Sequence, residues 1–502
     1  MVRERRLPLL SEADRDTVRL AQDPGFTRWL EQIKAIGGCA HPIYLSGSTI
    51  TRDAHTGEVL SACSTADEPG ERLAVRCRNR RATICAPCSR LHAGDTFHLV
   101  RSGLTGGKTV PEAVRDRPRL FVTLTAPGFG PVHRIADDDS PCRPRRGRPR
   151  CAHGTPLSCS LTHSEGDPLT GQPVCPACYD YPGHVLWHAH AGRLWDRFTT
   201  AVRRHLASAA GIPRSRLGAH LMVSFAKVAE YQQRAAIHFH AVVRLDGPSG
   251  PGAAPPSWAT PELLADAVRA AAASVTVRVP ESAAYGAEAL GWGAQLDVRP
   301  IRSFGDGAGV SDDAVAAYVA KYVTKGATDT AAGLDHRVSG PEDIRTARVS
   351  GHVRALMGTC WRLGGLPELE DLRLRAWAHT LGYRGHILTK SQRYPTTYAA
   401  LRAERAEHQR TGAETAKEAH TVAEAAWRYV GSGHTPGAPL FAVLTLAFRP
   451  LGNEEVRVKG APAPSADWKN DHSMQCFADE STLLGHVELS RMPLLPDVLR
   501  DH

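Results

Sequence analysis

The 502-residue sequence lacks any apolar run close to the length of a membrane span, which needs about eighteen to twenty consecutive apolar residues. Its first ten residues include three arginines and a glutamate, and they lack the apolar core of a signal peptide. Internal repeats are absent as well. We therefore expect a cytoplasmic protein without a membrane partner.

A complete phosphate-binding loop is also missing. The stretch from Gly103 to Thr109 ends in Gly-Gly-Lys-Thr, as such loops do, but the motif requires a glycine five residues before Gly107, and Ser102 stands there. No apolar strand precedes the stretch. These two departures exclude an ATPase, and with it a built-in helicase.

The composition is that of a globular chain, with 42% apolar residues, and the length allows two to four domains. Basic residues number 61 and acidic residues 52, so the formal net charge is +9. A moderate positive excess suits a polyanionic partner such as nucleic acid, although it can also serve solubility alone.

Twelve cysteines in a chain expected to be cytoplasmic indicate metal binding rather than disulfides. Cys85 and Cys88 have the two-residue gap of a zinc knuckle, and Cys77 lies near enough in sequence to be a third ligand. Cys39 or Cys63 could be the fourth, and we choose Cys39. The alternative is a buried cluster of reduced thiols without metal, since cysteines also serve as small apolar residues.

A second cysteine-rich segment holds more candidate ligands than the four that one zinc ion needs. These are Cys151, His153, Cys159, His163, Cys175 and Cys178. We predict that the four cysteines, Cys151, Cys159, Cys175 and Cys178, bind one structural zinc ion, with His163 as a substitute ligand.

Two strand-like runs, residues 221–230 and 236–245, are separated by a short polar link and should pair as a hairpin. Alternate residues of a strand point the same way, so His238 and His240 share one side. Two imidazoles at this spacing can hold one cation, and Glu230, near the end of the partner strand, is our choice of third ligand. The alternative is that the histidines are hydrogen-bonded core residues.

A helix is predicted from Ser311 to Gly326, because a serine cap is followed at once by acidic residues in the first turn. Four of its side chains follow one another at i, i+3, i+4 and i+7 and so share one face: Tyr318, Lys321, Tyr322 and Lys325. Tyrosines at this spacing are usually packing residues. Lysines interleaved with them, however, are awkward in a core and suitable beside a phosphate, so we predict a catalytic face.

Three segments together resemble the motifs of the HUH endonucleases that initiate rolling-circle replication, namely Phe121 to Thr125, His238 to His240 and Tyr318 to Lys325, in that order. The doubled tyrosine is similar to the two-tyrosine replication proteins of small isometric phages. The wider pattern, including the cysteine-rich segments, resembles the replication initiators of actinobacterial plasmids and integrative conjugative elements. One departure is Ala235, in the link between the strands, where such relatives often carry glycine.

The resemblance implies a site- and strand-specific DNA nickase. A divalent cation at His238, His240 and Glu230, magnesium or manganese, would polarise the scissile phosphate, and a tyrosine would attack it. The products would be a 5′-phosphotyrosine link and a free 3′-hydroxyl that primes synthesis. Because an unperturbed tyrosine has a pKa of about 10, Lys321 or Lys325 is expected to favour the phenolate or to bind phosphate. The expected partners are single-stranded or locally melted origin DNA and a host helicase and polymerase.

The expected fold class is α+β, an HUH domain with a central antiparallel sheet and flanking helices, plus cysteine-rich zinc-binding modules and a mixed C-terminal region. We expect the first zinc module within residues 1–115, the nicking domain at 116–330 with its zinc-binding insertion near 140–180, and a region of unknown role at 331–502 that is helical over 397–430. Two rivals stay open. One is a two-tyrosine transposase or relaxase with the same chemistry, and the other is a zinc-dependent DNA-binding protein without catalysis.

Overall fold

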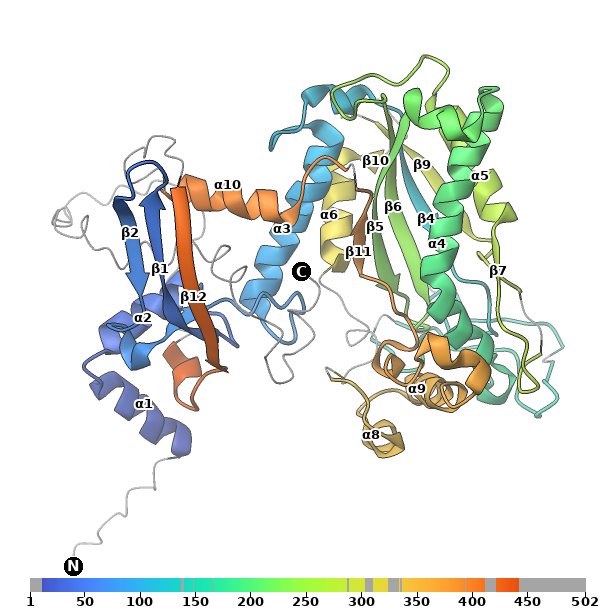
Figure 1. Ribbon diagram of the computed structural model, residues 1–502. Coiled ribbons are helices and arrows are strands. Elements are labelled where there is room, and N and C mark those ends of the chain that lie inside the picture. Colours follow the sequence, from blue (N-terminus) through green and yellow to red (C-terminus); the bar gives the residue numbers. More distant parts are fainter. Residues whose placement is uncertain are drawn as a thin grey trace, which may run out of the picture. The chain divides into compact units, whose positions relative to one another are not determined.

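The computed structural model describes residues 11–441 except 137–139, 148, 165, 287–288, 303–309, 324–333, 335, 393 and 411–420. The described residues form two compact units (Figure 1), one within residues 1–95 and 397–502 and the other within residues 96–396. The boundaries expected near residues 115 and 330 do not coincide with the limits of these units. The first unit is assembled from both ends of the sequence.

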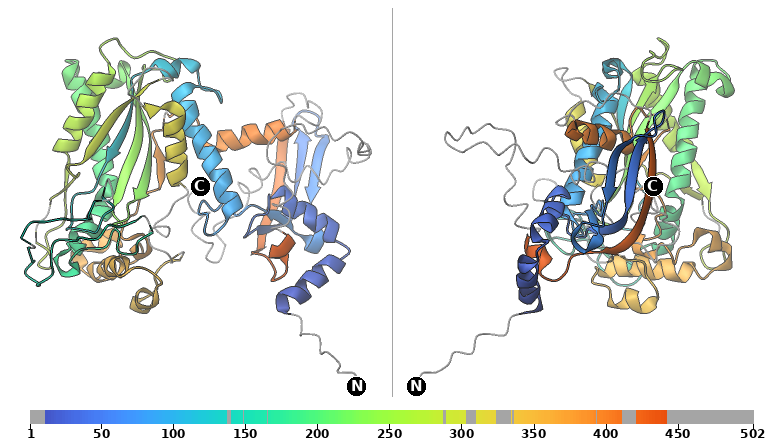
Figure 2. Two further views of the ribbon diagram at one scale, coloured as in Figure 1. Left: turned by 180° about the vertical axis from the view of Figure 1, so that it is seen from behind. Right: turned by 60° about the vertical axis from the view of Figure 1, so that its left-hand side comes forward.

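The first unit is built on a four-stranded sheet with β1 (Ile43–Asp53) at its centre. β1 pairs antiparallel along its whole length with β12 (Thr421–Ser432), the orange strand beside the blue ones in Figure 2. Its other edge pairs with β2 (Val59–Ser64) and β3 (Leu73–Val75). The unit also contains α1 (Glu12–Gln22), α2 (Phe26–Ala35), the beginning of α3 (Ala86–Thr105), and α10 (Tyr398–Arg410).

The prediction of a helix over residues 397–430 is correct for α10 and wrong for β12. The alanine-rich sequence of β12 favours a helix locally, but its pairing with β1 overrides that preference. Trp427 of β12 is buried, and its indole N–H donates a hydrogen bond to Oγ1 of Thr49 on β1 at 2.8 Å. Such a long-range partner cannot be recognised from a local pattern.

The second unit contains a six-stranded sheet in the order β10-β9-β4-β6-β5-β11. The strands are β4 (Arg119–Leu124), β5 (Met222–Tyr231), β6 (Ile237–Asp246), β9 (Leu296–Arg302), β10 (Val310–Ser311) and β11 (Leu388–Lys390). Neighbours are antiparallel except β10 and β9, which are parallel. The predicted α+β class with an antiparallel sheet is therefore confirmed, and β5 and β6 form the predicted hairpin.

Helices lie on both faces of this sheet (Figure 1). On one face α4 (Tyr181–Ala209) packs beside α5 (Pro261–Ser274), and Trp195 of α4 meets the rings of Phe225 and Phe239 edge-on. On the other face lies α6 (Asp312–Val323), the predicted tyrosine helix. Because Phe239 points into the core under α4, its neighbours His238 and His240 point toward the α6 face.

The remaining elements of the second unit surround this layered core. They are the pair β7 (Thr276–Arg278) and β8 (Ala289–Gly291), α8 (Pro341–Thr346), α9 (Gly351–Leu363), and the 3-10 helices Glu112–Asp116, Pro176–Cys178, Arg214–Ala219, Pro367–Leu372 and Ala378–Thr380. Between β4 and α4 the chain is held by isolated bridges, such as Arg143 with Cys159. Within the described part of the chain, no helix combines the length and apolarity that crossing a bilayer requires.

Candidate active site and metal centres

The β5–β6 hairpin sets the spacing of the predicted ligands. Its register places Glu230 directly opposite His238, and the turn closes with Ala235 N–H donating to the carbonyl of Gln232 at 2.8 Å. Ala235 has a φ of +59°, in the left-handed region that favours glycine. The turn therefore forms with alanine at this position, although the left-handed conformation is higher in free energy for alanine than for glycine.

Glu230, His238 and His240 converge on one point. Oε2 of Glu230 lies 2.8 Å from Nε2 of His238 and 2.9 Å from Nε2 of His240, and the two nitrogens are 3.1 Å apart. The His240 side chain is 3% exposed, and those of Glu230 and His238 are 14% exposed. One carboxylate and two imidazoles arranged in this way form a site that is suited to a divalent cation.

Thr123 fixes the orientation of His240 from the neighbouring strand. The register of β4 places Thr123 opposite His240, and its Oγ1 lies 3.0 Å from Nδ1 of that ring. When a cation is bound, a proton on Nδ1 that is donated to the hydroxyl leaves the lone pair of Nε2 directed at the ligand centre. The sequence identifies the segment from Phe121 to Thr125 as a motif, but it does not predict this role of Thr123.

Burial and hydrogen bonding set the ionisation of the site. Burial raises the pKa of Glu230, but the hydrogen bonds from His238 and His240 outweigh it and lower the pKa to about 2. Burial also lowers the pKa of His240, against the opposing effect of its bond to Glu230. An ionised carboxylate beside a neutral imidazole is the form in which these groups bind metal.

Tyr318 brings its hydroxyl to this site. Its oxygen lies 3.2 Å from Nε2 of His240, and Phe121 packs against both rings, parallel to His240 and edge-on to Tyr318. Tyr318 comes from α6, whose cap Ser311 accepts a hydrogen bond from the N–H of Ala314 as predicted. The helix thus places one tyrosine oxygen at the edge of the ligand centre.

The other predicted catalytic residues are placed less fully. Lys321 lies on α6 one turn beyond Tyr318 and is exposed. Tyr322 belongs to α6 by its backbone, but its side chain lies outside the described part of the chain, and so does all of Lys325. Their roles stay predictions.

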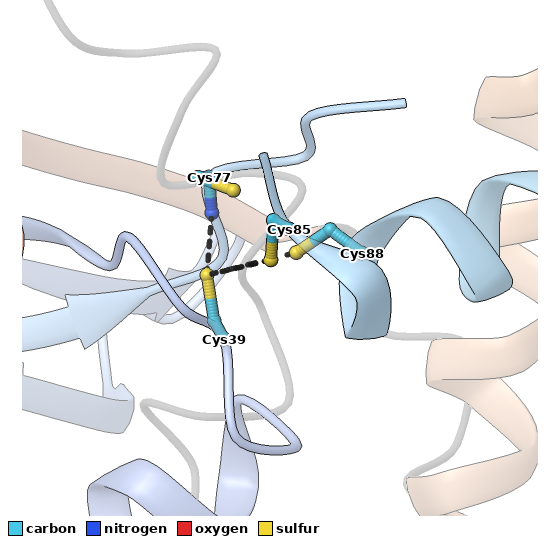
Figure 3. A group of neighbouring side chains, drawn as sticks. All are labelled: Cys39, Cys77, Cys85 and Cys88. Carbon is cyan, nitrogen blue, oxygen red and sulfur yellow. Dashed lines mark hydrogen bonds between the residues drawn. The ribbon is translucent and has the colours of Figure 1, made fainter. Parts of the chain in front are cut away.

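The first predicted cysteine set comes together in the first unit (Figure 3). Cys39, Cys77, Cys85 and Cys88 are all buried, and their sulfurs lie within 4.8 Å of one another. Backbone N–H groups of Cys77 and Ala40 point at the sulfurs of Cys39 and Cys85, each at 3.3 Å. Cys63 lies on β2 and is not part of the group. Four convergent thiols with N–H donors match a structural zinc site.

The second predicted set does not come together as one group. Instead the insertion between β4 and α4 brings together two sets of four. The outer cluster is Cys151, His153, Cys175 and Cys178, and the inner cluster is His133, Cys142, Cys159 and His163.

The expectation of one ion held by four cysteines must therefore be corrected. Cys159 belongs to the inner cluster, because bridging to Arg143 carries it to Cys142, and His153 takes its place beside Cys178 at 3.2 Å. His133 and Cys142 were missed, because neither has a second ligand two or three residues away. The signal that could have found them is the total of eight ligands, twice what one ion needs.

Comparison with known proteins gives a family for the chain. The family described as "RepSA: Replication initiator protein, pSAM2" matches residues 25–445. A replication initiator protein of Streptomyces ambofaciens is 46% identical over 452 residues, which cover 88% of this chain and 94% of that protein. No solved structure matches the chain.

Proposed function

The chain belongs to the RepSA family of replication initiator proteins, and from that premise we propose that it starts replication by nicking one DNA strand at an origin with a tyrosine nucleophile. The reaction would leave a 5′-phosphotyrosine link and a free 3′-hydroxyl for rolling-circle synthesis. The family supports an initiator over a transposase or relaxase, which share the chemistry but act on other DNA.

One observation carries the proposal, the position of the Tyr318 hydroxyl 3.2 Å from Nε2 of His240 in a site with three convergent ligands. A tyrosine that only packed the helix would not need its oxygen beside a metal-ligand nitrogen. The side chains of Glu230 and His238 are each 14% exposed, so solvent reaches the ligand centre on their side, and this is where we propose that the phosphate approaches.

Two histidines and a carboxylate suit manganese or zinc as well as magnesium, and the resemblance favours magnesium or manganese at His238, His240 and Glu230. When bound, the cation would lower the cost of negative charge on the phosphate oxygens. The protein's own residues supply the rest. The hydroxyl of Tyr318 gives up its proton to solvent and its oxygen attacks phosphorus. The bond from phosphorus to the 3′-oxygen breaks, and that oxygen takes up a proton from solvent and is released as the 3′-hydroxyl. Thr123 keeps Nε2 of His240 directed at the ligand centre throughout.

Lys321 is exposed one turn from Tyr318, where an ammonium group can bind the phosphates that flank the cleaved bond. Tyr322 follows Tyr318 by one turn and would be the second nucleophile, which cuts the regenerated origin while the first tyrosine remains attached. Lys325 would act with Lys321. The expected partners are single-stranded or locally melted origin DNA and a host helicase and polymerase.

The cysteine-rich sites would have a structural role. Cys39, Cys77, Cys85 and Cys88 would hold one zinc ion in the core of the first unit, and the outer cluster would hold another. Zinc at such closed sites contributes directly to folding, because the unfolded chain has no preformed site.

Cleavage of labelled single-stranded origin DNA with magnesium or manganese tests the proposal. Tyr318→Phe should abolish or strongly reduce the covalent adduct, and a double variant with Tyr322→Phe should abolish it. Tyr429→Phe, on β12 of the first unit, is the control and should cleave as the parent does. His238→Ala with His240→Ala should stop cleavage while the fold is retained, and leaving magnesium and manganese out of the reaction of the parent protein should do the same.

Two outcomes would contradict the proposal. Adduct formation by the double tyrosine variant would exclude these tyrosines as nucleophiles. Origin binding without cleavage by the parent protein, under all cations tested, would favour a zinc-dependent DNA-binding protein without catalysis.

A further inference from the structure

The ligands of the insertion alternate along the chain. In sequence order they form four pairs: His133 with Cys142, Cys151 with His153, Cys159 with His163, and Cys175 with Cys178. The first and third pairs make the inner cluster, and the second and fourth make the outer cluster. Because each cluster is made of two pairs with a pair of the other cluster between them in sequence, neither cluster can form from one continuous segment. We therefore infer that the two clusters fold together.

The inner cluster has the donors of a tetrahedral zinc site. Nδ1 of His133 lies 3.2 Å from Nε2 of His163, which is 3.4 Å from the sulfur of Cys159, and the sulfur of Cys142 is 3.9 Å from Nδ1 of His133. The backbone N–H of Arg134 points at the Cys142 sulfur at 3.2 Å. Two nitrogens and two sulfurs are the Cys2His2 donor set that zinc prefers.

Asp167 gives a second, independent indication that the inner cluster binds a metal ion. Its Oδ2 lies 2.6 Å from Nδ1 of His163, whose side chain is fully buried, and its other carboxylate oxygen accepts the N–H of Leu169 at 2.8 Å. A carboxylate bound to the outer nitrogen of a histidine fixes the tautomer and directs the inner nitrogen at a metal.

We propose that the inner cluster binds its own zinc ion, and that Asp167 orients the ligand His163 toward it. With a second ion in the outer cluster, the insertion then holds two ions. This ion also holds the base of the insertion against the catalytic hairpin. The inference does not depend on the proposed nicking activity.

The link to the hairpin runs through His133. Its N–H donates to the carbonyl of Gln172 and its carbonyl accepts from Gly171, both at 2.8 Å. Gly171 has a φ of +84°, and a Cβ there would stand 2.2 Å from the carbonyl oxygen of Gln233. Gln233 lies in the turn that joins β5 to β6, so the zinc ligand, the glycine and the turn form one packed contact.

The same turn is held from two other sides. The guanidinium of Arg234 donates to the carbonyls of Ala126 and Pro127, where the insertion begins, at 3.1 and 2.9 Å. Its own carbonyl accepts from Nε2 of His352 on α9 at 3.0 Å. The turn thus has three supports. If the inner cluster lost its ion, the support through His133 and Gly171 would be free to move.

Zinc counting in the full chain tests the number of ions. All samples carry His238→Ala and His240→Ala, so that the catalytic cation is not counted, and the four-cysteine site of the first unit serves as an internal reference. We expect three zinc ions per chain in this background and one after Cys142→Ser, Cys159→Ser, Cys151→Ser and Cys175→Ser together. A loss of one ion only would overturn the proposal. Cys360→Ala, a buried cysteine of the same unit outside both clusters, is the control and should keep three.

Asp167→Asn keeps all eight ligands and so tests the site without dismantling it. We expect one of the three ions to be lost to a chelator about 10–100-fold more readily than in the parent. Asp266→Asn, at an exposed carboxylate of α5, should change nothing. Equal release from both variants would contradict the role given to Asp167.

Hydrogen exchange tests the link to the hairpin. In Asp167→Asn treated with chelator, the amides of Gly171 and His133 and that of Ala235 in the turn should exchange faster than in the untreated variant. Unchanged exchange in the turn, after loss of the ion, would show that the inner cluster does not support the hairpin.

Discussion

Asp312, the first residue of α6, accepts a hydrogen bond at 2.7 Å from the guanidinium of Arg119, the first residue of β4. The two side chains are 11% and 2% exposed, so the pair is shielded from solvent. Arg119 also donates to the carbonyl of Leu104 at 2.6 Å. The strand that carries Thr123 and the helix that carries Tyr318 are thus joined at one end by a buried ion pair.

Asp312→Asn should lower the free energy of unfolding of the second unit by about 3 kcal/mol, because it leaves a buried guanidinium without its counter-charge. It should also reduce adduct formation, since the helix end that positions Tyr318 is released. Denaturant unfolding and the cleavage assay measure the two effects.

The control for that variant is the next residue. Asp313 pairs with Arg101 at 2.7 Å, but the two side chains are 59% and 46% exposed. Asp313→Asn should cost no more than about 1 kcal/mol, as exposed ion pairs do. Equal losses in the two variants would mean that burial of the pair is not what matters.

Thr123→Val should weaken cation binding at the active site by about 10–100-fold, because the ring of His240 loses the hydroxyl that orients it. The substitution preserves shape, so the strand should remain intact. Calorimetric titration with manganese measures the change. Thr276→Val, on the exposed face of β7, is the control, and an unchanged affinity in Thr123→Val would exclude an orienting role.

Lys227→Met should stabilise the second unit and reduce its dependence on pH. Lys227 is 3% exposed, and burial between Phe239 and Trp195 lowers its pKa to about 7, with Asp196 of α4 acting weakly in the opposite direction. Between pH 7 and about 10 the unfolded chain holds this proton and the folded chain does not, so stability rises with pH.

The gain from Lys227→Met should therefore be about 3–5 kcal/mol at pH 6 and small at pH 10. Urea midpoints at several pH values measure it. Lys34→Met, at an exposed lysine of α2, should show no such trend. A gain that does not change with pH would mean that the pKa of Lys227 is the same in the folded and the unfolded chain.

Cys39→Ser should remove zinc from the first unit and unfold it, because Cys39 lies in a core with Trp29, Ile33 and Tyr44. Cys63→Ser should retain the ion, since Cys63 lies outside the group. Zinc analysis and near-ultraviolet circular dichroism measure the two outcomes. Loss of zinc from Cys63→Ser, with retention in Cys39→Ser, would reverse the choice of fourth ligand.

Local periodicity accounts for the parts of the site that sequence could predict. Alternation in a strand places His238 and His240 on one side, and pairing across a short turn brings Glu230 opposite His238. The cap at Ser311 marks the start of the tyrosine helix. Each of these features is decided within about twenty residues of chain.

The features that sequence did not predict depend on distant segments. Arg119 and Asp312 meet because β4 and α6 pack on one sheet, and nothing near either residue marks the pair. The two clusters of the insertion alternate, so cysteines that follow one another in sequence, such as Cys151 and Cys159, belong to different groups. Sequence spacing identifies candidate ligands, but the three-dimensional path of the chain decides which of them lie in the same cluster.

The pairing of β1 with β12 has a consequence for how the protein is made. The nascent chain delivers β1 early, but the strand that covers one of its edges leaves the ribosome only after the whole second unit. Until then that edge presents unpaired backbone groups to other chains. Contacts between such distant segments also form slowly, so the first sheet to be translated is expected to be the last to close.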